Sequence, residues 1–234
     1  MKIINEITMR TFQLNDGHEI PSVGFGVYMI TDPDQCETSV LEALHAGYRH
    51  IDTANAYMNE KAVGRAMKKS GLNREEIFLT TKLWPTDYGY EKTKKAIEAT
   101  LARLDTPYID LLLLHQQYGD YLGAWKAMEE YVELGKVKSI GISNFSMERL
   151  QDLIDHATVL PAAAQVECHP YFQERELREY LNQYGILLES WYPLGHGDHQ
   201  LINELLFRAL GEKYHKSAVQ IILKWHIQEG FVVL

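Results

Sequence analysis

The sequence predicts an α/β protein whose parallel strands close into a (β/α)8 barrel. Short apolar runs of strand length alternate with amphipathic stretches of helix length over most of the 234 residues, and strands that alternate with helices usually pair in parallel. The alternation repeats often enough to close the sheet on itself. We therefore expect residues 1–234 to form one domain, since barrels of this type routinely exceed about 200 residues.

A hairpin is expected before the alternation begins. Asp16 and Gly17 stand between two extended runs, 11–14 and 19–23, and Asp-Gly in this position indicates a β-hairpin. Barrel strands are then predicted at 23–28, 50–52, 78–83, 109–115, 137–142, 162–167, 186–190 and 231–234. Helices are predicted at 34–46, 59–70, 90–104, 121–134, 147–156, 174–183, 200–214 and 217–229. Gly47 and Gly135 are suited to end two helices, and Ser146 is suited to cap another.

Composition limits the classes of function. The net charge of −9 argues against a nucleic-acid partner, because phosphate backbones are bound by basic surfaces. The first residues, Met1 to Glu6, are interrupted by charge and do not resemble a signal peptide, and no apolar run is long enough to span a membrane. Cys36 and Cys168 are too few for a disulfide framework. We expect a cytoplasmic protein without a membrane partner.

Three predicted strands end in ionisable side chains. Asp52 ends the run 50–52, Lys82 lies near the end of 78–83, and His115 ends 109–115, while Tyr57 follows Asp52 by five residues. Each residue alone has an ordinary structural explanation as a turn, packing or buried polar residue. The carboxyl ends of parallel strands share one edge, however, and (β/α)8 barrels build their sites there. Their joint placement therefore predicts a site.

The motifs around these residues resemble those of the aldo-keto reductase family. Their residues are most similar to those of the bacterial 2,5-diketo-gluconate reductase branch. The resemblance runs from about Thr11 to the last residue. It is carried by Gly47-Tyr48-Arg49-His50-Ile51-Asp52-Thr53-Ala54, Asn59-Glu60, Val63-Gly64, Thr81-Lys82-Leu83-Trp84, Tyr108-Ile109-Asp110-Leu111-Leu112-Leu113-Leu114-His115, Lys136-Val137-Lys138-Ser139-Ile140-Gly141-Ile142-Ser143-Asn144-Phe145, Gln165-Val166-Glu167-Cys168-His169-Pro170 and Ser190-Trp191-Tyr192-Pro193-Leu194-Gly195. The resemblance implies an NADPH-dependent oxidoreductase that reduces aldehydes, ketones or keto-sugars, with the hairpin of residues 11–23 covering the bottom of the barrel.

We expect Tyr57 to be the general acid of such a reduction. An ammonium group nearby stabilises a phenolate and lowers the pKa of the phenol, so Lys82 is expected to make Tyr57 more acidic. A buried Asp52 would pair with Lys82. His115 is expected to donate a hydrogen bond to the carbonyl oxygen and polarise it.

The hydride must come from a cofactor, because no side chain supplies one. Gly24-Phe25-Gly26 lacks the third glycine of a Rossmann fingerprint, and a tight entry into the first strand explains it better. The resemblance implies that Trp191 stacks on the nicotinamide, that Ser143, Asn144 and Gln165 hold its carboxamide, and that Asp52 is also a cofactor-binding residue. It also implies that the loop containing Leu194, Gly195, His196 and Gly197 offers amides to the pyrophosphate. A purely structural role for the polar residues is the alternative.

The substrate pocket is expected to be lined by Tyr28, Trp84, His115 and Tyr118. Gln116-Gln117 stands where the family often has Trp-Pro, which changes the expected polarity of the pocket. His196, Asp198 and His199 invite comparison with a metal site, but no further ligands occur at fixed spacing, so no metal is predicted.

The chain stops at Leu234, within the eighth predicted strand. In the resembled family this strand continues into a segment that grips the adenosine phosphate, and an eighth helix follows. We therefore expect a C-terminally truncated barrel with a partial eighth strand and no eighth helix. The family implies a monomer, although an uncovered sheet face would favour self-association. Two other hypotheses are a non-catalytic cofactor-binding subunit, as in potassium-channel beta subunits, and a shortened form with impaired cofactor binding.

Overall fold

Eight parallel strands form the centre of the computed structural model, which describes residues 10–197 and 199–234. The Met1 to Glu6 segment and Asp198, on which two expectations depended, lie outside these residues. The strands are β3 (Phe25–Gly26), β4 (His50–Asp52), β5 (Phe78–Leu83), β6 (Ile109–Leu114), β7 (Val137–Ser143), β8 (Ala163–Glu167), β9 (Leu187–Trp191) and β10 (Val232–Val233). They are hydrogen-bonded in the order of the chain, and every neighbouring pair is parallel. The predicted α/β class and parallel sheet are confirmed.

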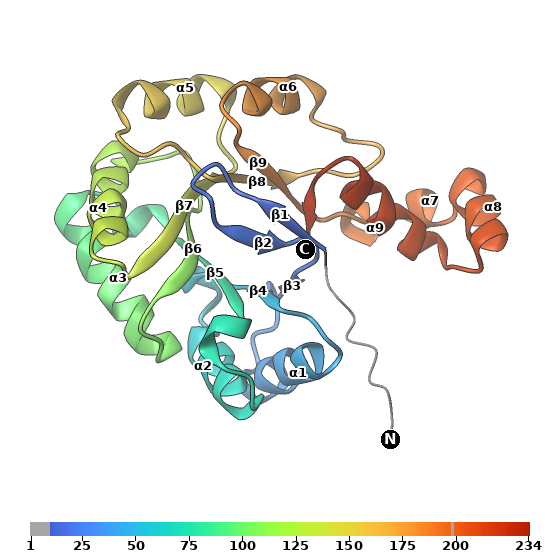
Figure 1. Ribbon diagram of the computed structural model, residues 1–234, viewed down its shortest axis with the longest axis horizontal. Helices are drawn as coiled ribbons and strands as arrows, with labels where there is room; N and C mark the ends of the chain where they lie inside the picture. Colours follow the sequence, from blue (N-terminus) through green and yellow to red (C-terminus); the bar gives the residue numbers. More distant parts are fainter. Residues whose placement is uncertain (1–9, 198) are drawn as a thin grey trace.

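The two edges of this sheet meet. An isolated parallel bridge joins Val23, just before β3, to Val233 in β10. The amide of Gly24 donates to the carbonyl oxygen of Val233 at 2.8 Å, and the amide of Val233 donates to that of Ser22 at 3.1 Å. The sheet therefore curls round until its first and last strands are in contact, which is consistent with a barrel (Figure 1).

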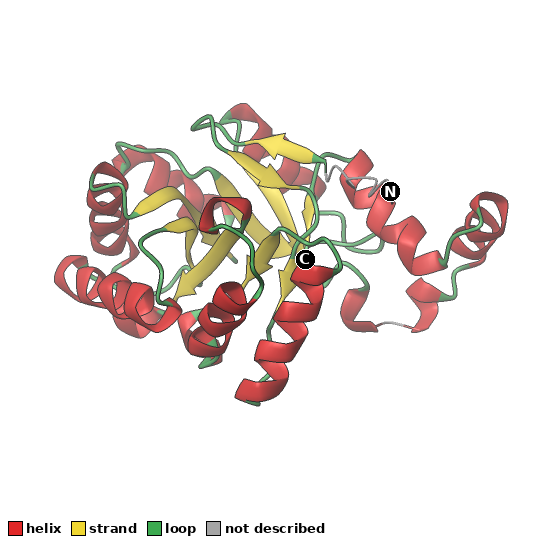
Figure 2. Cartoon of the chain, turned by 60° about the horizontal axis from the view of Figure 1, so that its bottom comes forward, coloured by secondary structure: helices red, strands yellow, loops and turns green. Residues whose placement is uncertain are grey.

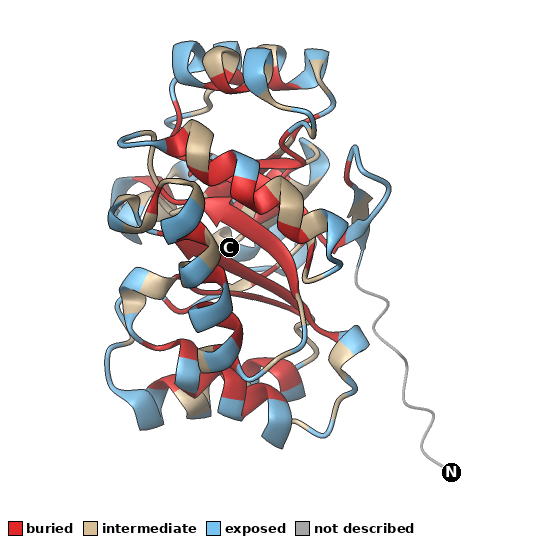
Figure 3. Ribbon diagram, turned by 90° about the vertical axis from the view of Figure 1, so that its left-hand side faces the viewer, coloured by how far each residue is buried: buried red, intermediate tan, exposed pale blue. Residues whose placement is uncertain are grey.

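Helices surround the strands on the outside (Figures 1 and 2). They are α1 (Pro33–His45), α2 (Glu60–Lys69), α3 (Tyr90–Leu104), α4 (Tyr121–Glu133), α5 (Met147–His156), α6 (Arg175–Gln183), α7 (His199–Ile202), α8 (Leu205–Tyr214) and α9 (Ala218–Gln228). The inner faces of α1 to α6 are buried against the sheet and their outer faces are exposed (Figure 3). None of the helices in the described part of the chain is long and apolar enough to cross a membrane.

Local sequence explains where several helices begin. The Asp32 side chain accepts from the amides of Asp34 and Gln35 at the start of α1. The predicted cap is confirmed at α5, where the Ser146 hydroxyl accepts from the amide of Arg149. Such caps satisfy amides that have no partner within the helix.

Two predicted elements differ from the structure. The first barrel strand is only Phe25–Gly26 instead of 23–28. Val23 forms only an isolated bridge, and the chain turns at Met29, whose φ is +63°. The helix predicted over 200–214 divides into α7 and α8. Around α7 to α9, Leu201, Phe207 and Ile222 form a small separate apolar cluster, and these helices extend away from the ring formed by α1 to α6 (Figure 1).

The predicted hairpin consists of β1 (Thr11–Gln13) and β2 (Glu19–Pro21), paired antiparallel. Leu14 and Ile20 pack with strand residues that include Phe78 and Ala163, which are the first residues of β5 and β8. The Asn15 amide donates to the carbonyl oxygen of Pro161, just before β8, at 2.8 Å. These contacts place the hairpin at the amino ends of the strands, so the carboxyl ends remain open.

Candidate active site

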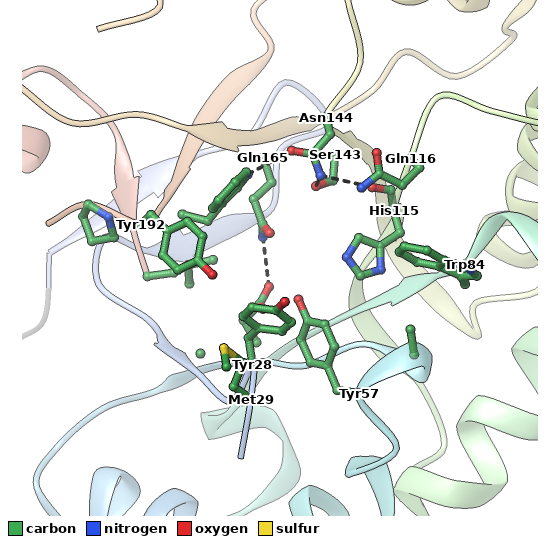
Figure 4. Close-up of a pocket in the computed structure, with 16 residues that line it drawn as sticks. Tyr28, Met29, Tyr57, Trp84, His115, Gln116, Ser143, Asn144, Gln165 and Tyr192 are labelled. Atoms are coloured by element: carbon green, nitrogen blue, oxygen red, sulfur yellow. Dashed lines mark hydrogen bonds between the residues drawn. The ribbon is translucent and has the colours of Figure 1, made fainter. Parts of the chain in front are cut away.

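A cavity of about 810 Å³ opens at the carboxyl ends of the strands. Asp52 enters it from the end of β4 and Tyr57 from the end of the short 3-10 helix Asn55–Tyr57. His115 follows β6 directly and also lines the cavity. Figure 4 shows Tyr57 and His115 facing the same space. Lys82 lies in β5, buried behind them.

The Lys82 ammonium connects Asp52 to Tyr57. Its Nζ lies 2.5 Å from Oδ1 of Asp52, 3.1 Å from the carbonyl oxygen of Thr53 and 3.5 Å from the hydroxyl of Tyr57. Lys82 is 1% exposed and Asp52 4% exposed. Burial disfavours the ammonium, but Asp52 and Tyr57 outweigh burial and raise the pKa of Lys82. Lys82 therefore remains charged beside the phenol.

The expected acidity of Tyr57 is wrong for this structure. Burial raises the pKa of the Tyr57 phenol, and this effect is larger than the lowering produced by Lys82. The Asp52 carboxylate also raises it. The physical reason is that desolvation penalises the phenolate more than one shared ammonium stabilises it. Tyr57 therefore holds its proton at neutral pH, as a proton donor must.

His115 faces the phenol as a neutral ring. The ring centroids of His115 and Tyr57 are 5.6 Å apart, and Trp84 packs edge-on against His115 at 4.9 Å. Burial, followed by the nearby Lys82, lowers the pKa of His115 to about 3. A neutral imidazole carries one N–H, so His115 can donate a hydrogen bond without supplying a charge.

Gln165 links Asp52 to a second buried carboxyl group. Its Nε2 donates to Oδ2 of Asp52 at 2.9 Å and to Oε2 of Glu189 at 3.2 Å. Glu189 lies in β9 and is fully buried. Burial, reinforced by Asp52, raises the pKa of Glu189 to about 8. Glu189 was not predicted as a site residue, although a carboxyl group two residues before Trp191 in an apolar run was a visible signal.

We expect Glu189 to make stability depend on pH. Its folded pKa is about 8, whereas an unfolded glutamate titrates near pH ~4.3. The folded state therefore binds more protons between these values, and stability must fall as pH rises through this window. Relative to Glu189→Gln, the wild-type protein should lose about 1 kcal/mol per pH unit, levelling off above about pH 8. Urea unfolding of both proteins from pH 5 to pH 9 measures this, and parallel curves would contradict the raised pKa.

Asn144 fixes the Trp191 ring at the cavity wall. The indole Nε1 of Trp191 donates to Oδ1 of Asn144 at 3.0 Å. Nδ2 of Asn144 donates to the carbonyl oxygen of His115 and to Oγ of Ser143. Asn144 has a φ of +59°, a left-handed conformation that asparagine tolerates better than most residues. Its polar atoms are therefore engaged in orienting Trp191.

Comparison with known proteins decides the family. The family model described as "Aldo/keto reductase family" matches residues 22–202. The chain belongs to the aldo/keto reductase family. The resemblance inferred from the motifs is thereby confirmed, and membership makes the protein an NAD(P)H-dependent oxidoreductase.

Similar proteins and solved structures support the same family assignment. This aldo/keto reductase is 42% identical to a glyoxal reductase of Bacillus subtilis, covering 96% of this chain and 81% of the relative. It is 40% identical to methylglyoxal reductase DkgA of Escherichia coli, covering 95% and 81%. A crystal structure of a Gox0644 mutant in complex with NADPH superposes with a TM-score of 0.90 and 39% identity, covering 97% of this chain and 82% of the other.

The structure does not bring every predicted site residue of this aldo/keto reductase into the cavity. Asp52, Tyr57, Trp84, His115, Ser143, Asn144, Gln165, Trp191 and Tyr28 line it. Tyr118, Leu194 and Gly195 are not among its lining residues. Tyr118 is 64% exposed, and the amide of Gly195 donates to the carbonyl oxygen of Tyr192. That amide is therefore already used within the turn.

Some lining residues were missed or left unassigned by the sequence analysis. Met29 and Tyr192 contribute to the wall, and Gln116 adds an amide beside His115 (Figure 4). Tyr192 directly follows Trp191, and Met29 directly follows Tyr28, so proximity to predicted residues was the available signal. Among the residues that the structure describes, no group of histidine, cysteine and carboxylate side chains could hold a metal ion.

Proposed function

We propose that this protein is an NADPH-dependent reductase of small aldehydes, ketones or keto-sugars, with Tyr57 as the general acid. The observation that carries the proposal is the buried series Asp52, Lys82 and Tyr57, joined at 2.5 Å and 3.5 Å at the cavity floor. A buried ammonium held by a carboxylate and touching a phenol suits a group that loses and regains a proton. The neutral His115 beside the phenol supplies a second donor for the same oxygen.

The cavity residues fit a nicotinamide cofactor. Trp191 offers an aromatic face that Asn144 holds in place. Gln165 uses its N–H groups on Asp52 and Glu189, and its Oε1 accepts no hydrogen bond from the described residues, so an acceptor remains for a carboxamide. When bound, NADPH supplies the hydride to the carbonyl carbon. The relative solved with NADPH supports this choice of cofactor.

The protein itself supplies the proton that the carbonyl oxygen receives. A carbonyl oxygen that gains negative charge is a stronger base than a phenolate, so the Tyr57 hydroxyl can give it a proton although burial raises the pKa of Tyr57. The phenolate that remains lies next to the Lys82 ammonium, which stabilises it until a proton returns. His115 donates to the same oxygen and limits the orientations of the carbonyl group.

The wall of the cavity favours small carbonyl compounds with some polar character. Tyr28, Trp84 and Tyr192 give aromatic surface, whereas Gln116 adds a polar side chain near His115. Aromatic walls with a few placed polar groups are typical of small-molecule sites. The names of the glyoxal and methylglyoxal reductases among the relatives support short dicarbonyl compounds as first substrates to assay.

Titration with NADPH should quench tryptophan fluorescence saturably, at about micromolar concentration. The reason is that Trp191 is expected to lie against the nicotinamide. Trp191→Phe should lose most of this quenching, while Trp125→Phe, which alters a buried ring in α4, should retain it. Fluorescence titration of the three proteins, followed by a carbonyl reduction assay, tests the proposal. Absence of quenching in the wild-type protein would contradict it.

A further inference from the structure

Glu189 is a buried carboxyl group for which the proposed reaction has no use. It lies in β9 with an exposure of 0%. Three ionisable groups lie near it from strands that are not its neighbours in the sheet: Asp52 and His50 of β4, and Lys82 of β5. His50 is the nearest on one side, with Nε2 3.7 Å from Oε1 of Glu189. Burial, then Lys82, lowers the pKa of His50 to about 3, so this imidazole is neutral and does not pair with Glu189 as a cation.

A buried carboxyl group without a cationic partner of its own is costly, so its retention needs a reason. Oε1 of Glu189 has no hydrogen-bond partner among the described residues. The contact that Glu189 does make is with Gln165, through Oε2 at 3.2 Å. This hydrogen bond connects Glu189 to the cavity, because Gln165 lines the cavity.

The orientation of the Gln165 amide determines which of its polar atoms faces the cavity. An amide group has two N–H donors on one side and one carbonyl acceptor on the other. Asp52 and Glu189 both present oxygen to Nε2 of Gln165, which leaves Oε1 for the cavity that Gln165 lines. With Asp52 alone, one N–H would be left without a partner, and the amide could rotate about its last torsion, which has broad preferences.

The amide of Asn144 does not offer the same acceptor. Oδ1 of Asn144 is taken by the Trp191 indole, and Nδ2 of Asn144 is used on His115 and Ser143. Of Asn144 and Gln165, Gln165 is therefore the one whose carbonyl oxygen can receive an N–H from a ligand.

We propose that Glu189 is a positioning residue that, together with Asp52, holds both N–H groups of Gln165, so that Oε1 of Gln165 faces the cavity and accepts an N–H from the carboxamide of a nicotinamide ring. The inference rests on the proposed function, because it assumes that a nicotinamide cofactor occupies the cavity. It adds a residue on β9, outside the cavity wall, to those that determine how the cofactor is recognised.

Two variants separate this role from simple packing. Glu189→Leu keeps a similar volume and removes the acceptor, and an apolar residue is often tolerated in place of a buried ionisable group. Glu189→Gln keeps an oxygen that can accept from Gln165. Each is titrated by tryptophan fluorescence with two oxidised cofactors: NADP⁺, and its 3-acetylpyridine analogue, in which an acetyl group without N–H donors replaces the carboxamide.

We expect Glu189→Leu to weaken NADP⁺ binding about three- to tenfold, the effect of one hydrogen bond. It should leave the affinity for the 3-acetylpyridine analogue unchanged, because that analogue has no N–H to offer Gln165. Glu189→Gln should bind both cofactors as the wild-type protein does. Equal weakening of both cofactors in Glu189→Leu would indicate a packing effect and overturn the inference, as would unchanged binding of both.

The titrations also distinguish failure of the proposed function from failure of the role of Glu189. A wild-type protein that binds neither cofactor would overturn the nicotinamide site and, with it, this role of Glu189. A wild-type protein that binds NADP⁺, with no selective loss in Glu189→Leu, would overturn the role of Glu189 alone.

Discussion

Tyr57→Phe should lower the rate of carbonyl reduction by about 10²–10⁴-fold, the usual contribution of a positioned general acid. The variant removes the hydroxyl that lies 3.5 Å from Nζ of Lys82 and retains the ring that packs against Tyr28 at 5.1 Å. Fluorescence titration should therefore give an unchanged affinity for NADPH. Steady-state kinetics of the two proteins with one aldehyde measure the effect.

The same variant distinguishes a reductase from a cofactor-binding regulatory subunit. In a reductase, binding persists and turnover is lost. In a binding subunit, the wild-type protein itself would bind NADPH without turnover. A variant that reduced the aldehyde at the wild-type rate would show that another group supplies the proton.

Lys82→Met should destabilise the fold by about 3–5 kcal/mol, because it leaves the buried Asp52 carboxylate without its cation. Asp52 is 4% exposed, and Lys82 is the cation that lies 2.5 Å from its Oδ1. Reduction should also slow, since no ammonium would remain beside the Tyr57 phenolate. Urea unfolding and steady-state kinetics of the same preparation measure both effects.

The double variant Asp52→Asn with Lys82→Met is the matched control. It removes the unpaired charge while the asparagine oxygen can still accept from Gln165, so most of the lost stability should return. Activity should remain low, because the ammonium is still missing. A double variant as unstable as Lys82→Met alone would show that the loss comes from packing of the lysine stem.

The sequence predicted the positions of the site residues well where they end a strand. Asp52, Lys82 and His115 were expected together because parallel strands present their carboxyl ends at one edge, and the structure places them within one region. Leu194 and Gly195 were expected near the cofactor from the resemblance alone; they follow β9 and do not line the cavity. The loop turns there through an internal hydrogen bond from Gly195 to Tyr192, and sequence position alone does not define such a turn.

Electrostatic effects were harder to predict than positions. Lys82 does act to lower the pKa of Tyr57, as expected, but burial of the phenol has the larger effect. The balance depends on how much water reaches the hydroxyl, which is a property of the assembled cavity. Glu189 escaped prediction for a related reason, because its chemistry depends on Asp52 and Gln165, residues from two other strands.

The bridge between Val23 and Val233 also bears on the synthesis of the protein. It joins residues from nearly opposite ends of the chain, and contacts of such high sequence separation form slowly because a long loop must close first. During translation, the segment before β3 cannot pair with β10 until β10 has left the ribosome. Until then its edge is exposed, and such an edge invites pairing with other chains. The seam of the sheet is therefore expected to be the last part of the barrel to form.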